Sequence, residues 1–117
     1  MRAATPPDLD LLQGTLEVMM LKALSWGPLH GFGVAKWIRQ TTDDVLQIED
    51  SALYPALHRM EHRGLVDAEW GLTENNRRAK YYRLTAKGRQ QLRANVSSWD
   101  RYSLAVSKVV HATLQPS

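Results

Sequence analysis

The sequence predicts a mainly α-helical protein with one small β-hairpin, and three observations carry this prediction. Three short segments with helical apolar spacing come first along the 117 residues. Two alternating segments separated by a polar turn follow. The last segment keeps helical spacing for longer than one small domain can cover. We therefore expect a first domain over residues 1–85 and a long C-terminal helix over residues 86–117.

The first helix is expected to begin at Asp8, which would serve as its N-cap. Gly27 and Pro28 then interrupt the chain and end the helix. Its apolar residues recur at threes and fours: Leu9, Leu12, Leu16, Met19, Met20, Ala23 and Leu24.

The second helix is expected over residues 30–41, with Val34, Ala35 and Ile38 on its inner face. Gly31 and Gly33 near its start allow another part of the backbone or a side chain to approach closely. The segment that follows is polar and predicts a loop, with a short strand at residues 46–48.

The third helix begins near Ser51, which is expected to cap it, and Pro55 is expected in its first turn. Gly64 follows the last apolar position and predicts the C-terminal end. The core stripe of this helix consists of Leu53, Ala56, Leu57 and Met60.

The hairpin is predicted by "LVDAEW" and "KYYRLT", in which apolar and polar residues alternate. Val66, Ala68 and Trp70 share one face of the first strand, and Tyr82 and Leu84 share the inner face of the second. Between them lies the polar stretch "GLTENNRRA", which contains turn-forming residues. The tryptophans outside the last helix are assigned to packing: Trp26, Trp37 and Trp70.

The last helix is expected from about Ala86 to Leu114. Because its apolar stripe is too long for so small a domain, it predicts a homodimer in which this helix packs on a second copy. The first helix would add Leu12, Leu16 and Met19 to the same seam. The stripe consists of Leu92, Val96, Trp99, Tyr102, Val106, Val109 and Val110.

Positive charge is concentrated in one stretch, although the net charge is only +3. No acidic residue lies between Glu74 and Asp100, and such a local field attracts phosphates. The chain has no cysteine, no apolar run of membrane-spanning length and no signal-like N-terminus, so we expect a cytoplasmic protein. The cations of this stretch are Arg77, Arg78, Lys80, Arg83, Lys87, Arg89 and Arg93.

Three helices followed by a hairpin make a winged helix-turn-helix, in which the third helix enters the DNA major groove. The hairpin, or wing, then lies along the DNA backbone or reaches the minor groove. Double-stranded DNA carrying an inverted repeat is therefore the expected partner. Asn76 has two interpretations, as a DNA contact and as a simple turn residue. The predicted DNA-binding residues are Ser51, Tyr54, Pro55, His58, Arg59, Asn76, Arg77, Arg78, Lys80 and Tyr81.

The segments "LHGFGVAKWIRQ", "SALYPALHRMEHRGLVDAEWG" and "NNRRAKYYRLTAKG" resemble those of PadR-family transcriptional regulators. The similarity covers roughly residues 8–101, and the length resembles the small members with a single C-terminal helix. The resemblance implies a homodimeric winged-helix repressor that a small molecule releases from DNA.

Small members of that family have a ligand slot at the dimer axis, and "SSWDRY" resembles their segment there. Trp99 of each chain would then face its copy and hold a planar aromatic effector by stacking and cation–π attraction. The alternative is that Trp99 only packs. The further residues expected to line the slot are Val96, Met19, Asp100 and Ser103.

Two alternatives remain open: a winged-helix module for protein–protein assembly and a winged-helix regulator of the MarR type. A zinc protease is considered only because "HRMEH", residues 58–62, matches a zinc-protease pattern. A third ligand and a substrate cleft are not evident, and no nucleophile–base pair or phosphate loop is present. We therefore expect no enzyme activity, no metal and no cofactor.

Overall fold

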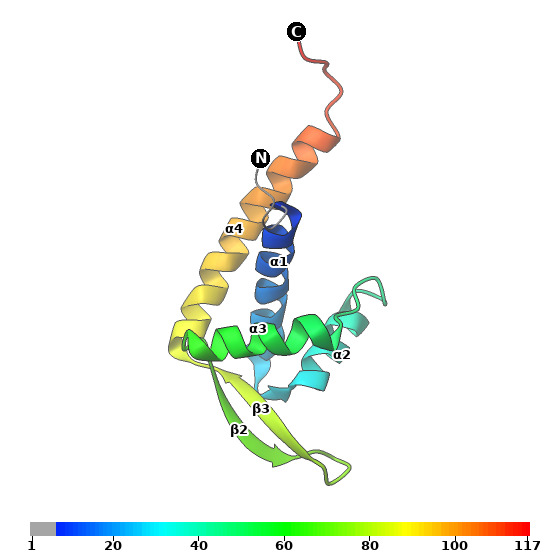
Figure 1. Cartoon of the computed structure of the whole chain (residues 1–117). Helices are drawn as coiled ribbons and strands as arrows, with labels where there is room; N and C mark the ends of the chain where they lie inside the picture. Colours follow the sequence, from blue (N-terminus) through cyan, green and yellow to red (C-terminus); the bar gives the residue numbers. More distant parts are fainter. Residues whose placement is uncertain (1–6) are drawn as a thin grey trace.

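The computed structural model describes residues 7–117, with side chains described from residue 14 onward. Within this part the chain forms four α-helices and a three-stranded antiparallel sheet, as the sequence predicts except for one strand (Figure 1). In chain order the elements are α1 (Pro7–Ala23), the 3-10 turn η1 (Leu24–Trp26), β1 (Leu29–His30), α2 (Gly31–Thr41), α3 (Asp50–His62), β2 (Val66–Leu72), β3 (Arg78–Leu84) and α4 (Ala86–Val110).

The sheet has the order β1-β3-β2, so β3 lies in its centre. The hairpin of β2 and β3 is confirmed, with Val66 opposite Leu84 at its base and Leu72 opposite Arg78 near its tip. The sequence did not predict β1, which pairs Leu29 with Tyr82. Two residues are too few to show alternation, and their pairing depends on a partner far along the chain.

The core lies where α1, α2, α3 and the base of the hairpin meet. Figure 1 shows α1 and α4 side by side, with α4 continuing well beyond the rest of the fold. Leu16, predicted for a seam between chains, is instead buried in this core, and Met19 packs against it. The largest fully buried side chains are Met20, Leu21, Leu24, Ile38, Leu53, Leu57, Met60, Leu65, Val34 and Val66.

The ends of α3 differ in how well the sequence predicted them. Its N-cap is Glu49 and not Ser51, so Pro55 falls in the second turn and removes one helical hydrogen bond to the Ser51 carbonyl. The predicted C-terminal end at Gly64 is confirmed, since this glycine has φ 76°. The N–H groups of Gly64 and Leu65 donate to the carbonyls of Glu61 and Met60, a Schellman motif.

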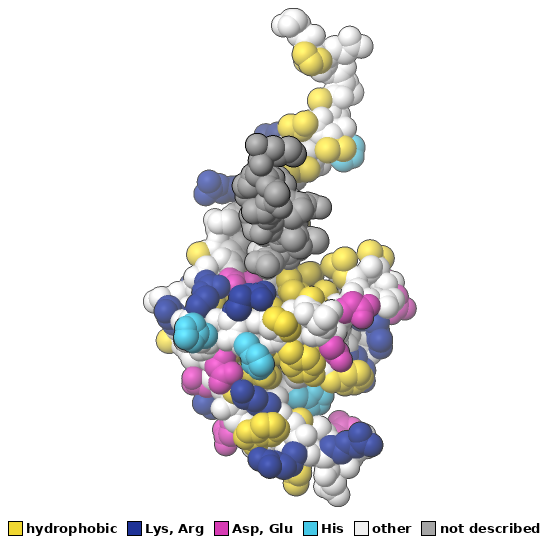
Figure 2. Space-filling view, viewed as in Figure 1, with side chains coloured by type: hydrophobic (Ala, Val, Ile, Leu, Met, Phe, Trp, Pro, Cys, Tyr) yellow, Lys and Arg dark blue, Asp and Glu magenta, His cyan; other side chains and the backbone are white. Residues whose placement is uncertain are grey.

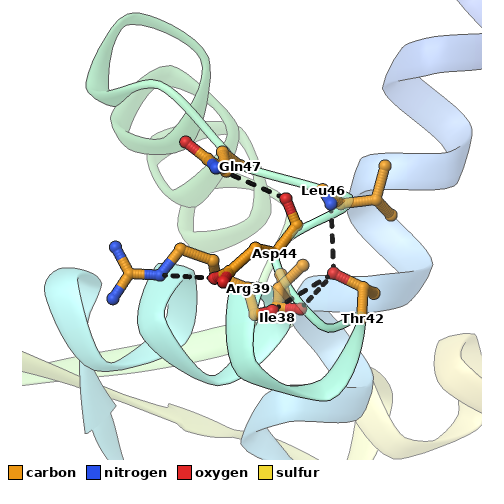
Figure 3. A network of polar contacts seen from close by, with 6 residues as sticks. All are labelled: Ile38, Arg39, Thr42, Asp44, Leu46 and Gln47. Atoms are coloured by element: carbon orange, nitrogen blue, oxygen red, sulfur yellow. Dashed lines mark hydrogen bonds and ion pairs between the residues drawn. The ribbon is translucent and has the colours of Figure 1, made fainter.

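The segment between α2 and α3 contains no strand, so the predicted strand at Leu46–Ile48 is wrong. Figure 3 shows why this stretch is a closed loop: the Thr42 hydroxyl donates to the Ile38 carbonyl at 2.9 Å and accepts from the Leu46 N–H at 3.1 Å. Asp44 adds an ion pair with Arg39 at 3.6 Å. These contacts lie within the loop itself. A strand at residues 46–48 would instead need a neighbouring strand, and none of the described residues forms one there.

Two other expectations were wrong, namely the C-terminal end of α4 and the packing of two tryptophans. The helix α4 stops at Val110, short of Leu114, and His111 caps it by donating its N–H to the Ser107 carbonyl. Trp37 packs against the core as predicted, but Trp26 and Trp70 are 69% and 58% exposed. Asp8 lies within α1, and its side chain, like that of Leu12, is outside the described part.

The three functional elements α3, hairpin and α4 meet at Thr85, the N-cap of α4. Its hydroxyl donates to the Gly64 carbonyl at 2.7 Å and accepts from the Gly88 N–H at 3.0 Å. Its own N–H donates to the Leu65 carbonyl at 3.1 Å. Gly88 is buried here, and a Cβ built on it would lie 2.0 Å from the Leu65 oxygen. Only glycine therefore allows the first turn of α4 to sit on the base of the hairpin.

We predict that Gly88→Ala lowers the free energy of unfolding by about 1–3 kcal/mol or more, because backbone must move to admit the methyl group. The control is Gly14→Ala within α1, where a Cβ meets nothing within 4 Å. That substitution should raise stability by about 0.5–1 kcal/mol through helix propensity. Urea unfolding followed by circular dichroism measures both, and equal effects of the two variants would contradict the close approach.

Candidate nucleic-acid interface

The outer face of α3 is free, as the sequence predicts. Its buried residues all point to the core, whereas Ser51, Tyr54, Pro55, His58 and Arg59 are exposed. Figure 2 shows this face of the molecule: basic side chains and histidines lie over α3 and over the hairpin below it, with a few acidic ones between them. Major-groove reading requires a helix with an accessible polar face and cations nearby for the phosphates, and this surface has an exposed helix face with basic side chains beside it.

Tyr54 has a structural contact besides its exposed edge. Its ring lies directly on Gly31 at the start of α2, where an added Cβ would come within 2.7 Å of the ring. The close approach expected at Gly31 is thus confirmed, while Gly33 has only ordinary contacts, none closer than 3.5 Å. Tyr54 therefore sets the spacing of α2 and α3 and still leaves 38% of its surface exposed.

The turn of the hairpin places two arginines at its tip. Asn76 takes the left-handed conformation with φ 59°, which favours asparagine in turns. The turn is closed by the Thr73 N–H, which donates to the Arg77 carbonyl at 2.9 Å, and by the Asn76 N–H, which donates to the Thr73 carbonyl. Asn76 is therefore a turn residue, and Arg77 and Arg78 follow it at the exposed end.

The cations of the basic stretch are not equivalent, although the sequence suggests one unopposed cluster. Lys80 donates to Glu61 of α3 at 3.2 Å, and this pair is about one third exposed. Arg83 lies 3.7 Å from Asp67 across the hairpin. Two of the cations thus have acidic partners that are distant in sequence, which the count of charges along the stretch did not reveal.

Two further cations of the stretch support the fold. Lys87 donates to the Arg63 carbonyl at 2.9 Å and so satisfies the C-terminal end of α3. Arg89 donates to the Ser25 carbonyl at 3.4 Å. The two arginines at the tip of the hairpin differ from these cations. Arg77 forms no ion pair or ring contact with a described residue, and Arg78 lies over the Trp70 ring at 4.7 Å from its centroid. Within the hairpin, the positive charge without an acidic partner is therefore concentrated at the tip.

The two tyrosines of β3 serve the wing itself. The Tyr81 hydroxyl donates to the Leu72 carbonyl at 3.0 Å, and its ring meets His30 edge-on at 5.3 Å. Tyr82 is buried at the base of the sheet, and this burial raises the pKa of its phenol above the usual 10.0. Tyr82 thus stays neutral under physiological conditions and contributes packing rather than charge.

Around α4 the structure brings together only part of the predicted effector residues. Val96 and Asp100 line a groove of about 520 Å³ with Lys22 of α1 and with Leu92, Arg93, Ser97 and Arg101. Trp99 does not line it: the ring is 42% exposed and lies 6.3 Å from that of Tyr102. Met19 packs against the core, and the Ser103 hydroxyl donates to the Asp100 carbonyl at 3.3 Å.

Other site classes find little support in the described part of the chain. Among these residues no three His, Cys, Asp or Glu side chains are grouped closely enough to hold a metal ion. The glutamate of "HRMEH", Glu61, is paired with Lys80. No helix within residues 7–117 is both long enough and apolar enough to cross a membrane.

Sequence reasoning missed three residues that shape this surface. His30 caps α2 by accepting the Gly33 N–H on its Nδ1 at 2.9 Å, and Glu61 holds Lys80. Trp70 was assigned to packing but supports Arg78 on the surface. For His30 the sequence did contain a signal, because it stands three residues before Gly33, which is the usual spacing between an N-cap side chain and the N–H that it accepts. The other two depend on contacts between separate elements, for which a single sequence has no signal.

Comparison with known proteins identifies the lineage. The family model described as the transcriptional regulator PadR-like family matches residues 20–94. A protein of Lysinibacillus sphaericus without an assigned function is 27% identical over 90 residues, which are 77% of this chain and 83% of that protein.

Two solved structures agree with this match. A PadR family transcriptional regulator from Eggerthella lenta is 31% identical, and the match covers 91% of this chain and 90% of that one with a TM-score of 0.71. A transcriptional regulator from Clostridium thermocellum is 28% identical, and the match covers 85% of this chain and 96% of that one with a TM-score of 0.76. These matches favour the PadR lineage over the MarR alternative.

Proposed function

The chain belongs to the PadR-like family of transcriptional regulators, and we propose that it acts as a homodimeric repressor that binds an inverted repeat in DNA and is released by a planar aromatic effector. The observation that carries the proposal is the single surface formed by the free face of α3 and the arginines at the wing tip. The family is one of DNA-binding regulators and not of enzymes. The proposed place of action is the cytoplasm.

In the proposed complex, α3 reads bases and the wing contacts phosphates. Ser51 lies in the first turn of α3, Tyr54 and Pro55 follow in the second, and His58 and Arg59 lie beyond them on the exposed face. Arg77 and Arg78 would bring positive charge to the phosphates of the DNA backbone, whereas Lys80 and Tyr81 chiefly hold the wing in place. A module for protein–protein assembly gains less from two adjacent arginines without acidic partners than a DNA-binding wing does, so this alternative is weaker.

The dimer is proposed from the exposed stripe of α4. Val96, Trp99, Val106 and Val110 follow one another at intervals of three, seven and four residues, which keeps them on one face of the helix, and each leaves about 40% or more of its surface exposed. A stripe of this kind that extends past the domain is typical of a helix that packs on a second copy. A two-fold dimer would also match the symmetry of an inverted repeat.

The effector site is proposed at Trp99, near the middle of α4. The exposed side chain of Trp99 and the Tyr102 ring beside it present aromatic surface. Asp100 lines the adjoining groove together with the cations Lys22, Arg93 and Arg101, so the attraction for a cation would come from the aromatic rings and not from the groove. With a second copy opposite, such surfaces would stack on a planar cation. Regulation requires that the effector prefer the dimer geometry that cannot bind DNA.

The first prediction concerns DNA. On a duplex selected from a random pool, affinity should fall about 10³–10⁵-fold between 50 and 200 mM salt if six to ten phosphates are contacted. Arg78→Gln should weaken selected and random duplexes by similar factors, whereas Tyr54→Ala and His58→Ala should weaken the selected duplex more. Titrations by fluorescence anisotropy measure all of these.

The matched control for this prediction is Arg83→Gln, which removes one positive charge from the same strand but from a residue paired with Asp67. It should change affinity much less than Arg78→Gln. Identical losses for all four variants on both duplexes would show that α3 and the wing do not have the proposed separate roles.

The second prediction concerns the dimer. Val106→Glu places a charge in the stripe of α4 and should shift the protein from dimer to monomer at micromolar concentration, with a loss of tight DNA binding. Lys108→Glu introduces the same side chain at an exposed position that points about 160° away from Val106 on α4, and it should leave the dimer intact. Sedimentation velocity distinguishes them; a monomeric parent chain, or equal behaviour of both variants, argues against this interface.

The third prediction concerns Trp99, one of four tryptophans. A planar dye cation should quench part of the tryptophan fluorescence and weaken DNA binding, whereas neutral riboflavin should bind less tightly. Trp99→Ala should abolish the saturable quenching, and Trp26→Ala, which removes another exposed indole, should retain it. If the dye binds Trp99→Ala as tightly as the parent chain, Trp99 has only a packing role.

A further inference from the structure

Trp70 is exposed on the wing in a way that packing does not explain. Its indole is 58% exposed in the middle of β2, and the neighbouring Leu72 is 63% exposed on the same face. Towards the base of the hairpin this face is buried, with Val66 and Tyr82 in the core. Trp70 therefore lies just beyond the core, where the wing leaves the domain.

The strand register explains why Arg78 reaches this ring. Trp70 stands opposite Lys80, and Leu72 stands opposite Arg78, so all four side chains lie on one face of the hairpin. Lys80 turns to Glu61 of α3 and leaves the indole face to another cation. Arg78 is the diagonal neighbour, within reach of a long side chain, and its guanidinium carbon lies 4.7 Å from the ring centroid.

An aromatic partner restrains an arginine differently from an acidic one. A carboxylate offsets the charge of the guanidinium and can accept its N–H groups. Asp67 supplies such a negative charge 3.7 Å from Arg83. A ring contacts only the flat face of the guanidinium, so the N–H groups in its plane and its full charge stay available. Arg78 is thus held in position and still free to bind an anion.

We propose that Trp70 is a positioning residue that holds the Arg78 guanidinium ready for a phosphate of the DNA backbone. This inference rests on the proposed DNA-binding function and deepens it. A restrained side chain loses less conformational entropy when it binds, and this loss is otherwise large for arginine. Arg77 has no such partner among the described residues, so its side chain would lose this conformational entropy in full on binding.

The first test needs no DNA. In the free protein, ring current from Trp70 should shift the Arg78 side-chain protons upfield in NMR spectra, and Trp70→Leu should return them towards ordinary values. Trp26→Leu is the matched control, because Trp26 is another exposed indole with a cation, Lys22, at 4.7 Å from its ring. Unshifted Arg78 protons in the parent chain would overturn the stacking contact itself.

The second test is a double-mutant cycle on duplex affinity. Trp70→Leu should weaken binding about two- to fivefold per wing, the range expected for an exposed cation–π contact, and Trp70→Tyr should restore part of it. In an Arg78→Gln background, Trp70→Leu should change affinity little, because the residue it positions is gone. Trp26→Leu should have no effect in either background.

The outcomes separate this inference from the function on which it rests. Equal losses from Trp70→Leu with and without Arg78 would overturn the positioning role, since Trp70 would then act by itself. A lower melting temperature for Trp70→Leu with no rescue by Trp70→Tyr would also overturn it and assign Trp70 to wing stability. Absence of duplex binding by the parent chain would instead overturn the proposed function, whatever the NMR spectra show.

Discussion

The arrangement of this chain depends on one junction, where Thr85 joins the end of α3, the base of the hairpin and the start of α4. A single side chain donates to Gly64 and accepts from Gly88, and its backbone N–H is bonded to Leu65. Gly88 completes the contact, because no other residue fits against the Leu65 carbonyl. The two elements that would touch DNA are thereby fixed to the helix that would hold the dimer.

This junction couples α4 to α3, so a change in the direction of one helix would also change the position of the other. The hydrogen bonds of Thr85 join the end of α3 to the first turn of α4, so a change in the angle between them would have to break or distort these bonds. The α1 helix adds a second tie, since Asn95 of α4 donates to Glu17, which also pairs with Arg63 beyond α3. In the proposed dimer, a change in how two α4 helices cross would therefore move both α3 helices.

The fold was largely predictable because each element has a local signal. Helical spacing identified the four helices, alternation identified the hairpin, and Gly64 marked the end of α3. The failures have a common cause, which is dependence on a partner elsewhere. The strand β1 exists only because β3 lies beside it, and the loop at residues 42–49 is closed by Thr42 rather than extended as a strand.

The site was less predictable, and the wing shows the reason most clearly. Along the sequence, Arg78 and Lys80 are two cations of equal standing, and the stretch around them has no acid. In the fold, Glu61 approaches one of them and Trp70 approaches the other, so that Lys80 is neutralised and Arg78 is not. The number of charges along the sequence therefore predicts that a polyanion binds here. Which cations have structural roles and which stay available depends on tertiary contacts. An ion pair and a cation–π contact leave different numbers of N–H donors free. On the same strand, Lys80 therefore braces the hairpin against α3, while Arg78 stays available for the proposed phosphate contact.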